Sequence, residues 1–466
     1  MSEGAQPLHP PLAQSDVPAR KSKSIVVCCD GTGNQFGDTN SNVVKFYTAL
    51  EISSDQFGYY HPGVGTLGDP TLPNRVARSW SRIKGLAFGA GFKDNVLDAY
   101  RYLMETYNDG DRVYLIGFSR GAYTVRALAG LLDGYGLLCR GNEGHIPYAW
   151  RLYVNQHDQR SRRAINPAID DAAAFKETFS HSDFKIQFVG VFDTVSSVGW
   201  IYSPLRLFNV AQNPTILTGR QAVSIDERRC FYQDNLWGDS LPGQDIQQVW
   251  FSGVHSDVGG GYLQQTAGLS NISLQWMLLQ AHQAGIRLVP ERVSLVLGDP
   301  TTAYPAAQPI YRKPTSSPVH HSLDWKWWPL EVFPHIYYDK DLGQELRRIP
   351  LGAWRQIPDG ALVHASVAQR FKDPAAGYAP RNLDADDLTV LADGPTDPGG
   401  NPLLYVYHPK AKPVEDAKKR LLVLWPVGTV ESLLGLFLVF LVGRAGVWLF
   451  LSLVHFLCKV AGCSAN

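Results

Sequence analysis

The chain of 466 residues lacks an excess of either charge, because 43 Lys and Arg balance 43 Asp and Glu. Proteins that bind DNA or RNA usually carry a basic excess, so this balance argues against a nucleic-acid partner. Cysteine is scarce as well, since six residues in a chain of this length cannot build a disulfide framework. Cys28 and Cys29 lie in an apolar run, so we expect buried thiols and synthesis in a reducing compartment, the cytoplasm.

The N-terminal segment lacks the apolar core of a signal peptide. Residues 1–22 are polar and rich in proline, so we predict a disordered tail and no Sec-type export. Export would then need a dedicated secretion system. Internal repeats are missing too, which argues against solenoid and propeller folds.

Apolar runs alternate with segments of helical periodicity through the first half of the chain. With 45% hydrophobic and 18% charged residues, a large core is expected. The expected strands are 24–29, 59–61, 112–116, 185–192 and 248–254, and the expected helices are 92–107 and 122–132. Buried strands that alternate with helices predict an α/β fold with a mostly parallel central sheet flanked by helices.

The spacing of these elements suggests four regions after the tail is set apart. We expect a catalytic domain over 23–290, with helical insertions at about 140–182 and 199–247, where the connections are long. Residues 291–420 have weak periodicity and several Pro-rich stretches, which indicates an accessory or lid region. Residues 421–466 form an apolar, helical, membrane-associating segment.

The membrane prediction depends on residues 433–458, which are apolar apart from Arg444 and His455. Their Leu, Val and Phe side chains outweigh the cost of one arginine in a bilayer, so the segment could span it or re-enter it. Alternatively, residues 443–446 break the run into a packed helical hairpin. Lys418, Lys419 and Arg420 would keep the catalytic region on the cytoplasmic side.

Residues 117–121 (GFSRG) fit the G-x-S-x-G pattern of a nucleophile elbow, with an apolar strand before them and a helix after them. In this turn the nucleophile takes a strained conformation between two small residues. We therefore predict Ser119 as the nucleophile. The alternative is a structural turn with an ordinary N-cap serine.

A serine nucleophile needs a base and an orienting carboxylate, which follow it in the chain order Ser, Asp, His in α/β-hydrolases. Asp193 ends one apolar strand, and His255 follows the next one before three consecutive glycines. Active sites of open α/β sheets collect at such strand ends. Asp193 and His255 are thus the expected acid and base, although a cap and a backbone-bonded loop histidine are the alternatives.

The oxyanion needs two N–H donors, and we assign them to Arg120 and to Gly31-Thr32. The turn at residues 30–33 lacks the Gly-Lys-Ser/Thr of a P-loop, so nucleotide binding is not expected. His255 and Asp257 have no third ligand nearby in the sequence, so we expect neither a metal nor another cofactor.

Five motifs follow one another along roughly residues 23–285. They are CCDGTGN (28–34), GFSRGAYTVRALAGLL (117–132), VFDTVSSVG (191–199), SIDERR (224–229) and WFSGVHSDVGGGY (250–262). Together they resemble the α/β-hydrolase domain family that includes type VI secretion phospholipase effectors. The resemblance implies an α/β-hydrolase core and hydrolysis of glycerophospholipid esters, with Ser119, Asp193 and His255 at the positions of the triad. Residues 290–466 resemble no family that we can name.

These observations predict a serine hydrolase, a phospholipase-like carboxylic ester hydrolase, with a lipid or other ester as substrate. The cluster at residues 325–328 (WKWW) suits a membrane interface, although a core contact is equally compatible. One alternative is a soluble-substrate esterase or thioesterase with the same triad. Another is a membrane-tethered scaffold that has lost activity. An inhibitory or secretion partner is not identifiable from the sequence.

Overall fold

The structure is a computed structural model of the chain. It describes residues 21–31, 37, 39–63, 91–160, 167–195, 199–200, 203–204, 207, 210–298, 317–332, 335–339, 344–397 and 399–410. Residues 433–458 of the expected membrane segment lie outside these ranges. Among the described residues, no helix is both long and apolar enough to cross a membrane.

In this part of the chain, nine strands form one central sheet in the order β2-β1-β3-β4-β7-β8-β11-β13-β12. The strands are β1 Ser24–Cys29, β2 Gln56–His61, β3 Arg112–Phe118, β4 Ile186–Phe192, β7 Ile216–Ser224, β8 Asp245–Phe251, β11 Leu362–His364, β12 Leu388–Val390 and β13 Leu404–Tyr407. From β2 to β11 every neighbouring pair is parallel, and β13 and β12 then continue the sheet in antiparallel pairs. The predicted α/β fold with a mostly parallel sheet is confirmed.

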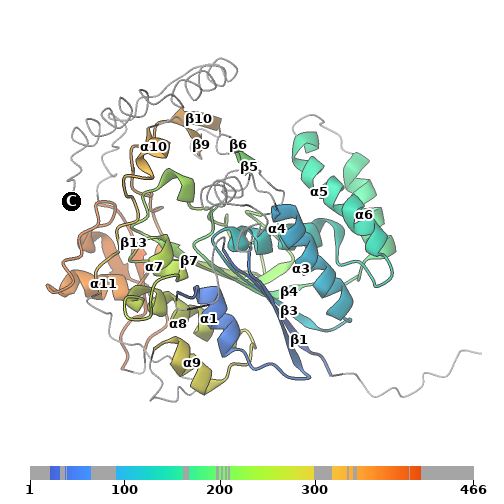
Figure 1. Cartoon of the computed structure of the whole chain (residues 1–466), viewed down its shortest axis with the longest axis horizontal. Helices are drawn as coiled ribbons and strands as arrows, with labels where there is room; N and C mark the ends of the chain where they lie inside the picture. Colours follow the sequence, from blue (N-terminus) through green and yellow to red (C-terminus); the bar gives the residue numbers. More distant parts are fainter. Residues whose placement is uncertain are drawn as a thin grey trace, which may run out of the picture.

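Helices cover both faces of the sheet (Figure 1). The helices of the described residues are α1 Asn42–Ala49, α3 Phe92–Thr106, α4 Arg120–Tyr135, α5 Ile146–Arg160, α6 Pro167–Phe179, α7 His255–Gly259, α8 Gly268–Gln283, α9 Pro290–Val296, α10 Trp328–Glu331 and α11 Ala365–Lys372. Short 3-10 turns occur at Glu143–His145, Cys230–Tyr232 and Ala385–Asp387, and two small ladders pair β5 Gly199–Trp200 with β6 Ser203–Pro204 and β9 His335–Asp339 with β10 Gln344–Arg348.

Strand β1 shows why an unbroken apolar run predicts a central strand. Ile25, Val27 and Cys29 pack with α3 and α4 on one face, whereas Val26 and Cys28 pack with α1 and α8 on the other. Successive side chains of a strand point to opposite faces, so a strand covered on both sides must be apolar throughout.

The stretch 199–247 differs from the expected helical insertion, because it contains β7 in the middle of the sheet. The sequence of this strand is not continuously apolar, because its polar side chains have buried hydrogen-bond partners. Arg220 donates to Asp245 at 2.5 Å and to Gln280 at 2.6 Å, and Gln221 lies fully buried beside Arg126 at 3.4 Å. The earlier long connection does hold helices, α5 and α6.

The sheet does not end at residue 290. β11 pairs with β8, and Val363 and Tyr407 share a core cluster with Val223 and Trp250. Part of the expected accessory region therefore builds the same sheet as the first half of the chain. The division into catalytic and accessory regions stays a prediction.

Candidate active site

Ser119 lies between β3 and α4 with φ of 58° and ψ of −121°, a conformation that L residues seldom adopt. The flanking glycines allow it. A Cβ atom on Gly117 would lie 2.6 Å from Cα of Ala122, and one on Gly121 would lie 2.1 Å from the carbonyl oxygen of Cys29. Both contacts are shorter than real Cβ atoms show, so the turn from β3 into α4 requires small residues on each side of Ser119.

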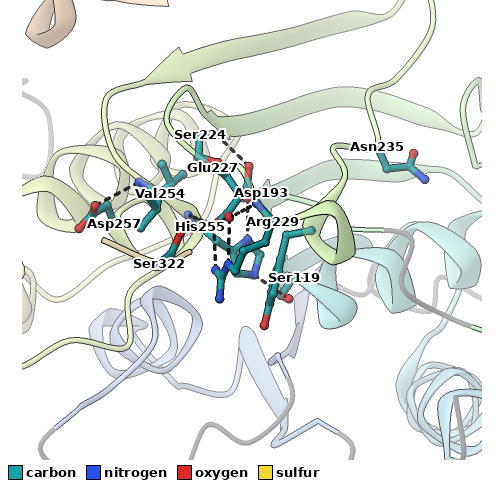
Figure 2. A network of polar contacts seen from close by, with 12 residues as sticks. Ser119, Asp193, Ser224, Glu227, Arg229, Asn235, Val254, His255, Asp257 and Ser322 are labelled. Carbon is teal, nitrogen blue, oxygen red and sulfur yellow. Dashed lines mark hydrogen bonds and ion pairs between the residues drawn. The ribbon is translucent and has the colours of Figure 1, made fainter. Parts of the chain in front are cut away.

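The three residues predicted as a triad meet at the carboxyl ends of β3, β4 and β8 (Figure 2). Nε2 of His255 lies 2.8 Å from Oγ of Ser119, and Nδ1 of His255 lies 2.6 Å from Oδ2 of Asp193. All three side chains are buried. A carboxylate at Nδ1 places the imidazole proton there, so Nε2 faces the serine as an acceptor.

The surroundings of His255 and Asp193 determine the charges of these two side chains. Burial lowers the pKa of His255 below 6.5, although the carboxylate of Asp193 opposes that shift. Burial by itself would raise the pKa of Asp193, but Arg355 and the hydrogen bond with His255 hold it well below its usual range. At neutral pH the site thus pairs a neutral imidazole with an ionised carboxylate.

Arg355 was not foreseen from the sequence. Its Nη1 lies 2.6 Å from Oδ1 of Asp193 and its Nη2 lies 3.1 Å from Oδ2, so the guanidinium donates hydrogen bonds to both carboxylate oxygens. The backbone N–H of Ser224 also donates to Oδ1 at 2.9 Å. No signal in the sequence connects Arg355 with Asp193, because 162 positions separate them.

Glu227 also belongs to the site and lies in the SIDERR motif. Its Oε2 accepts from the backbone N–H of His255 at 3.1 Å and from Nη2 of Arg229 at 2.8 Å. Burial would raise the pKa of Glu227, but hydrogen bonding and charge from Arg229 lower it to about 2. Ser322 donates to the same carboxylate. Glu227 therefore anchors the backbone that carries the histidine.

Aromatic rings enclose the imidazole of His255. The ring of Phe118 lies 4.7 Å from it and that of Tyr232 lies 4.6 Å from it, measured between centroids. Trp327 packs against Tyr232 at 5.5 Å, and the guanidinium of Arg229 stacks on both of these rings. These rings leave the imidazole little contact with bulk solvent, since His255 is 4% exposed.

The expected oxyanion donors are placed in part. Arg120 is the first residue of α4, so its N–H belongs to the positive end of the helix. Gly31 follows β1 beside this first turn, but its N–H donates to Oδ1 of Asp30 at 2.6 Å. Thr32 lies outside the described residues.

Asp257 does not approach the triad as a metal ligand would. Its carboxylate accepts from the N–H groups of Val254 and His320 and lies 2.6 Å from Nδ1 of His320. In the described part of the chain, no three His, Cys, Asp or Glu residues are grouped as a metal site requires. The function of Asp257 in this structure is to tie the segment around residue 320 to α7.

Comparison with known proteins bears on the same region. The family model "T6SS, Phospholipase effector Tle1-like, catalytic domain" matches residues 23–280. The chain belongs to this family. The match confirms the resemblance drawn from the five motifs.

Individual relatives cover only parts of the chain. The uncharacterized protein YEL023C of Saccharomyces cerevisiae is 38% identical over 216 residues, which are 44% of this chain and 31% of that protein. The chain thus spans about a third of this curated relative. A crystal structure of an uncharacterized protein from Pseudomonas aeruginosa is similar with 20% identity and a TM-score of 0.34, over 59% of this chain and 47% of that one. The Tle1 effector bound to the VgrG spike has 19% identity and a TM-score of 0.28, over 53% and 52%.

Proposed function

We propose that the chain is a serine hydrolase that cleaves carboxylic esters of lipids, a phospholipase that works through a Ser-Asp-His triad and an acyl-enzyme. The observation that carries this proposal is the continuous line of short contacts from Ser119 through His255 to Asp193. Membership in a phospholipase effector family supports the lipid substrate.

In the proposed reaction, Nε2 of His255 takes the proton of Ser119 while Oγ attacks the ester carbonyl carbon. The tetrahedral intermediate collapses as His255 returns the proton to the leaving alcohol, and the acyl group stays on Ser119. Water, deprotonated by His255, then attacks the acyl-enzyme and releases the fatty acid. Throughout these steps Asp193 holds the tautomer and stabilises the imidazolium.

The oxyanion would rest on the N–H of Arg120 and on a second donor from the end of β1. For Gly31 to be that donor, its hydrogen bond with Asp30 must open when substrate binds. Oδ2 of Asp30 also accepts from Oγ of Ser41 at 2.5 Å and from the hydroxyl of Tyr60 at 2.9 Å, so this oxygen would keep both hydrogen bonds. Thr32 remains the other proposed source.

Trp325 is 68% exposed, and Trp327, two residues later, packs on Tyr232 beside His255. Tryptophan favours the interface of a bilayer, so this edge of the molecule could meet a lipid surface next to the base. In the same proposal, the apolar segment 433–458 holds the enzyme at a membrane.

The test compares the full-length chain, Ser119→Ala and a truncation that ends near Lys419, on phospholipid liposomes and on a soluble short-chain ester. We expect Ser119→Ala to abolish both activities and the truncation to lose only the liposome activity. Wild-type turnover that persists in Ser119→Ala would contradict the triad. Turnover of the soluble ester alone would instead favour an esterase, and failure of a fluorophosphonate probe to label Ser119 would favour an inactive scaffold.

Export by a type VI secretion system is part of the proposal, since the family description names effectors of that system. A relative of part of the chain also occurs in Saccharomyces cerevisiae, so similarity alone does not imply export. Detection of the chain in the medium of a producing strain, and its loss when the secretion apparatus is disabled, would support export.

A further inference from the structure

Arg355 lies well beyond residue 280, where the family match ends. It precedes β11 and is 7% exposed. Besides the two contacts with Asp193, Nη1 donates to Oγ of Ser224 at 2.7 Å and to its carbonyl oxygen at 3.1 Å, and Nη2 donates to the carbonyl oxygen of Tyr232 at 2.6 Å. The guanidinium is thus fixed by the ends of β4 and β7 and by the loop that follows β7.

We propose that Arg355 is a positioning residue of the active site, which sets the orientation and the charge of Asp193, so that the catalytic unit extends past the region matched by the family. This inference rests on the proposed function, because it gives Asp193 the part of the orienting acid.

The bidentate contact with Arg355 sets the orientation of the Asp193 carboxylate. A carboxylate can rotate about its Cβ–Cγ bond, and without Arg355 the contact of Oδ2 with His255 and the hydrogen bond of Oδ1 with the N–H of Ser224 would restrain that rotation less firmly. The planar guanidinium binds both oxygens of Asp193 and therefore defines the plane of the carboxylate. Oδ2 is then held where it can accept from Nδ1 of His255 at 2.6 Å.

The charge argument concerns the base. Asp193 is 1% exposed, so its negative charge would be costly without a partner. Arg355 supplies that partner and also weakens the attraction of Asp193 for a proton on His255. Removal of the guanidinium charge should therefore raise the pKa of His255, because a less compensated carboxylate stabilises the imidazolium more strongly.

Other charged and titratable groups face the same centre. Glu227 raises the pKa of His255 and Arg229 lowers it, both from the loop after β7. Asp234 and Glu227 act on Arg355, and the hydroxyl of Tyr232 is buried beside the imidazole. These groups stay in place when Arg355 alone is replaced.

The experiment uses full-length Arg355→Met and Arg355→Lys, with Arg220→Met as the matched control. Arg220 is 6% exposed and pairs with Asp245, but it lies on β7 about 13 Å along the strand from Ser224. Thermal unfolding checks that each variant folds. The readouts are kcat and KM for a soluble short-chain ester across pH, and the pH titration of the His255 Nδ1 proton by NMR.

For Arg355→Met we expect kcat to fall about 10- to 100-fold, the range found when outer partners of carboxylate–histidine pairs at metal sites are removed. The acid limb of the kcat profile and the NMR titration should both move to higher pH, and KM should change little. Arg355→Lys keeps the positive charge but loses the bidentate guanidinium contact. Its acid limb should therefore match that of the wild type, whereas its kcat should be lower. Arg220→Met should leave the rate and both titrations unchanged.

Wild-type rates and titrations in Arg355→Met would overturn the inference while the proposed function stands, provided that Ser119→Ala is inactive. If Arg355→Met does not fold, Arg355→Lys decides, and an unchanged kcat in that variant would overturn the inference. Absence of any Ser119-dependent turnover would contradict the proposed function itself. In that case an Nδ1 titration in Arg355→Met identical to that of the wild type would overturn the inference as well.

Discussion

Ser119 and Asp193 directly follow two neighbouring strands, and both have a positive φ, 58° and 39°, which is rare for residues other than glycine. Only two other non-glycine residues in the described part of the chain have a positive φ. Such strain costs about 1–3 kcal/mol for each residue and persists where the surroundings enforce it. Both strained residues belong to the candidate triad, so the backbone strain lowers the stability of the fold at the proposed active site.

Two separate variants, Ser119→Gly and Ser119→Ala, measure this strain. We expect the free energy of unfolding of Ser119→Gly to exceed that of Ser119→Ala by about 1 kcal/mol, because glycine adopts a positive φ without a Cβ clash. Both variants should be inactive. Equal stabilities in urea unfolding would show that the turn is not strained.

The pH profile of the wild-type enzyme follows from the burial of His255. Nε2 accepts a proton only when the imidazole is neutral, so activity should rise with pH as His255 loses its proton. Because burial lowers its pKa, the midpoint of the acid limb in kcat/KM should lie below pH 6.5. A midpoint above 6.5 on a soluble ester would mean that the Asp193 carboxylate outweighs burial.

Glu227 should stabilise the fold in a pH-dependent manner. Its pKa is 4.5 in the reference state and about 2 in the folded protein, so the stabilisation is complete above pH 4.5 and is lost as pH falls toward 2. We expect Glu227→Gln to lower the free energy of unfolding at pH 7 by about 3 kcal/mol, with the gap closing in acid.

Glu331→Gln is the control for that measurement. Burial raises the pKa of Glu331, so its charge destabilises the fold above that pKa and the opposite pH trend is expected. Urea unfolding of the two variants between pH 7 and about pH 2 distinguishes them. A constant gap for Glu227→Gln would refute the pairing with Arg229.

Trp325 provides a test of the lipid surface. Trp325→Ala should lower hydrolysis of liposomes about three- to tenfold, since part of the free energy of burying an aromatic side chain is lost. Hydrolysis of a soluble ester should not change. Leu295→Ala removes another exposed apolar side chain, on α9, and should affect neither substrate. Equal effects of the two variants on liposomes would argue against a specific lipid-facing edge.

The sequence could predict the strands whose surroundings are apolar and not those whose surroundings are polar. β1 and β3 are continuous apolar runs because helices cover them on both faces. β7 is equally central, but the partners of its Arg220 lie 25 and 60 positions away. Periodicity within a strand cannot reveal contacts of that kind.

The same limit applies to the candidate site. Ser119 is predicted from the G-x-S-x-G turn between a strand and a helix, and Asp193 and His255 from their places at strand ends, which are all local signals. Arg355 carries no such signal, since only the folded sheet brings it to Asp193. Glu227 lay in a motif that pointed to importance without showing its part, the anchoring of the backbone of His255.

The pairing of β8 with β11 also has a consequence for the order of events during synthesis. The ribosome produces Ser119, Asp193 and His255 well before Arg355 and β11, because the chain is made from its N-terminus. Until the later strand docks, β8 has an open edge and the proposed acid lacks its guanidinium. If the proposal for Arg355 holds, the nascent chain would have about 10- to 100-fold lower activity until this later part of the sheet was in place.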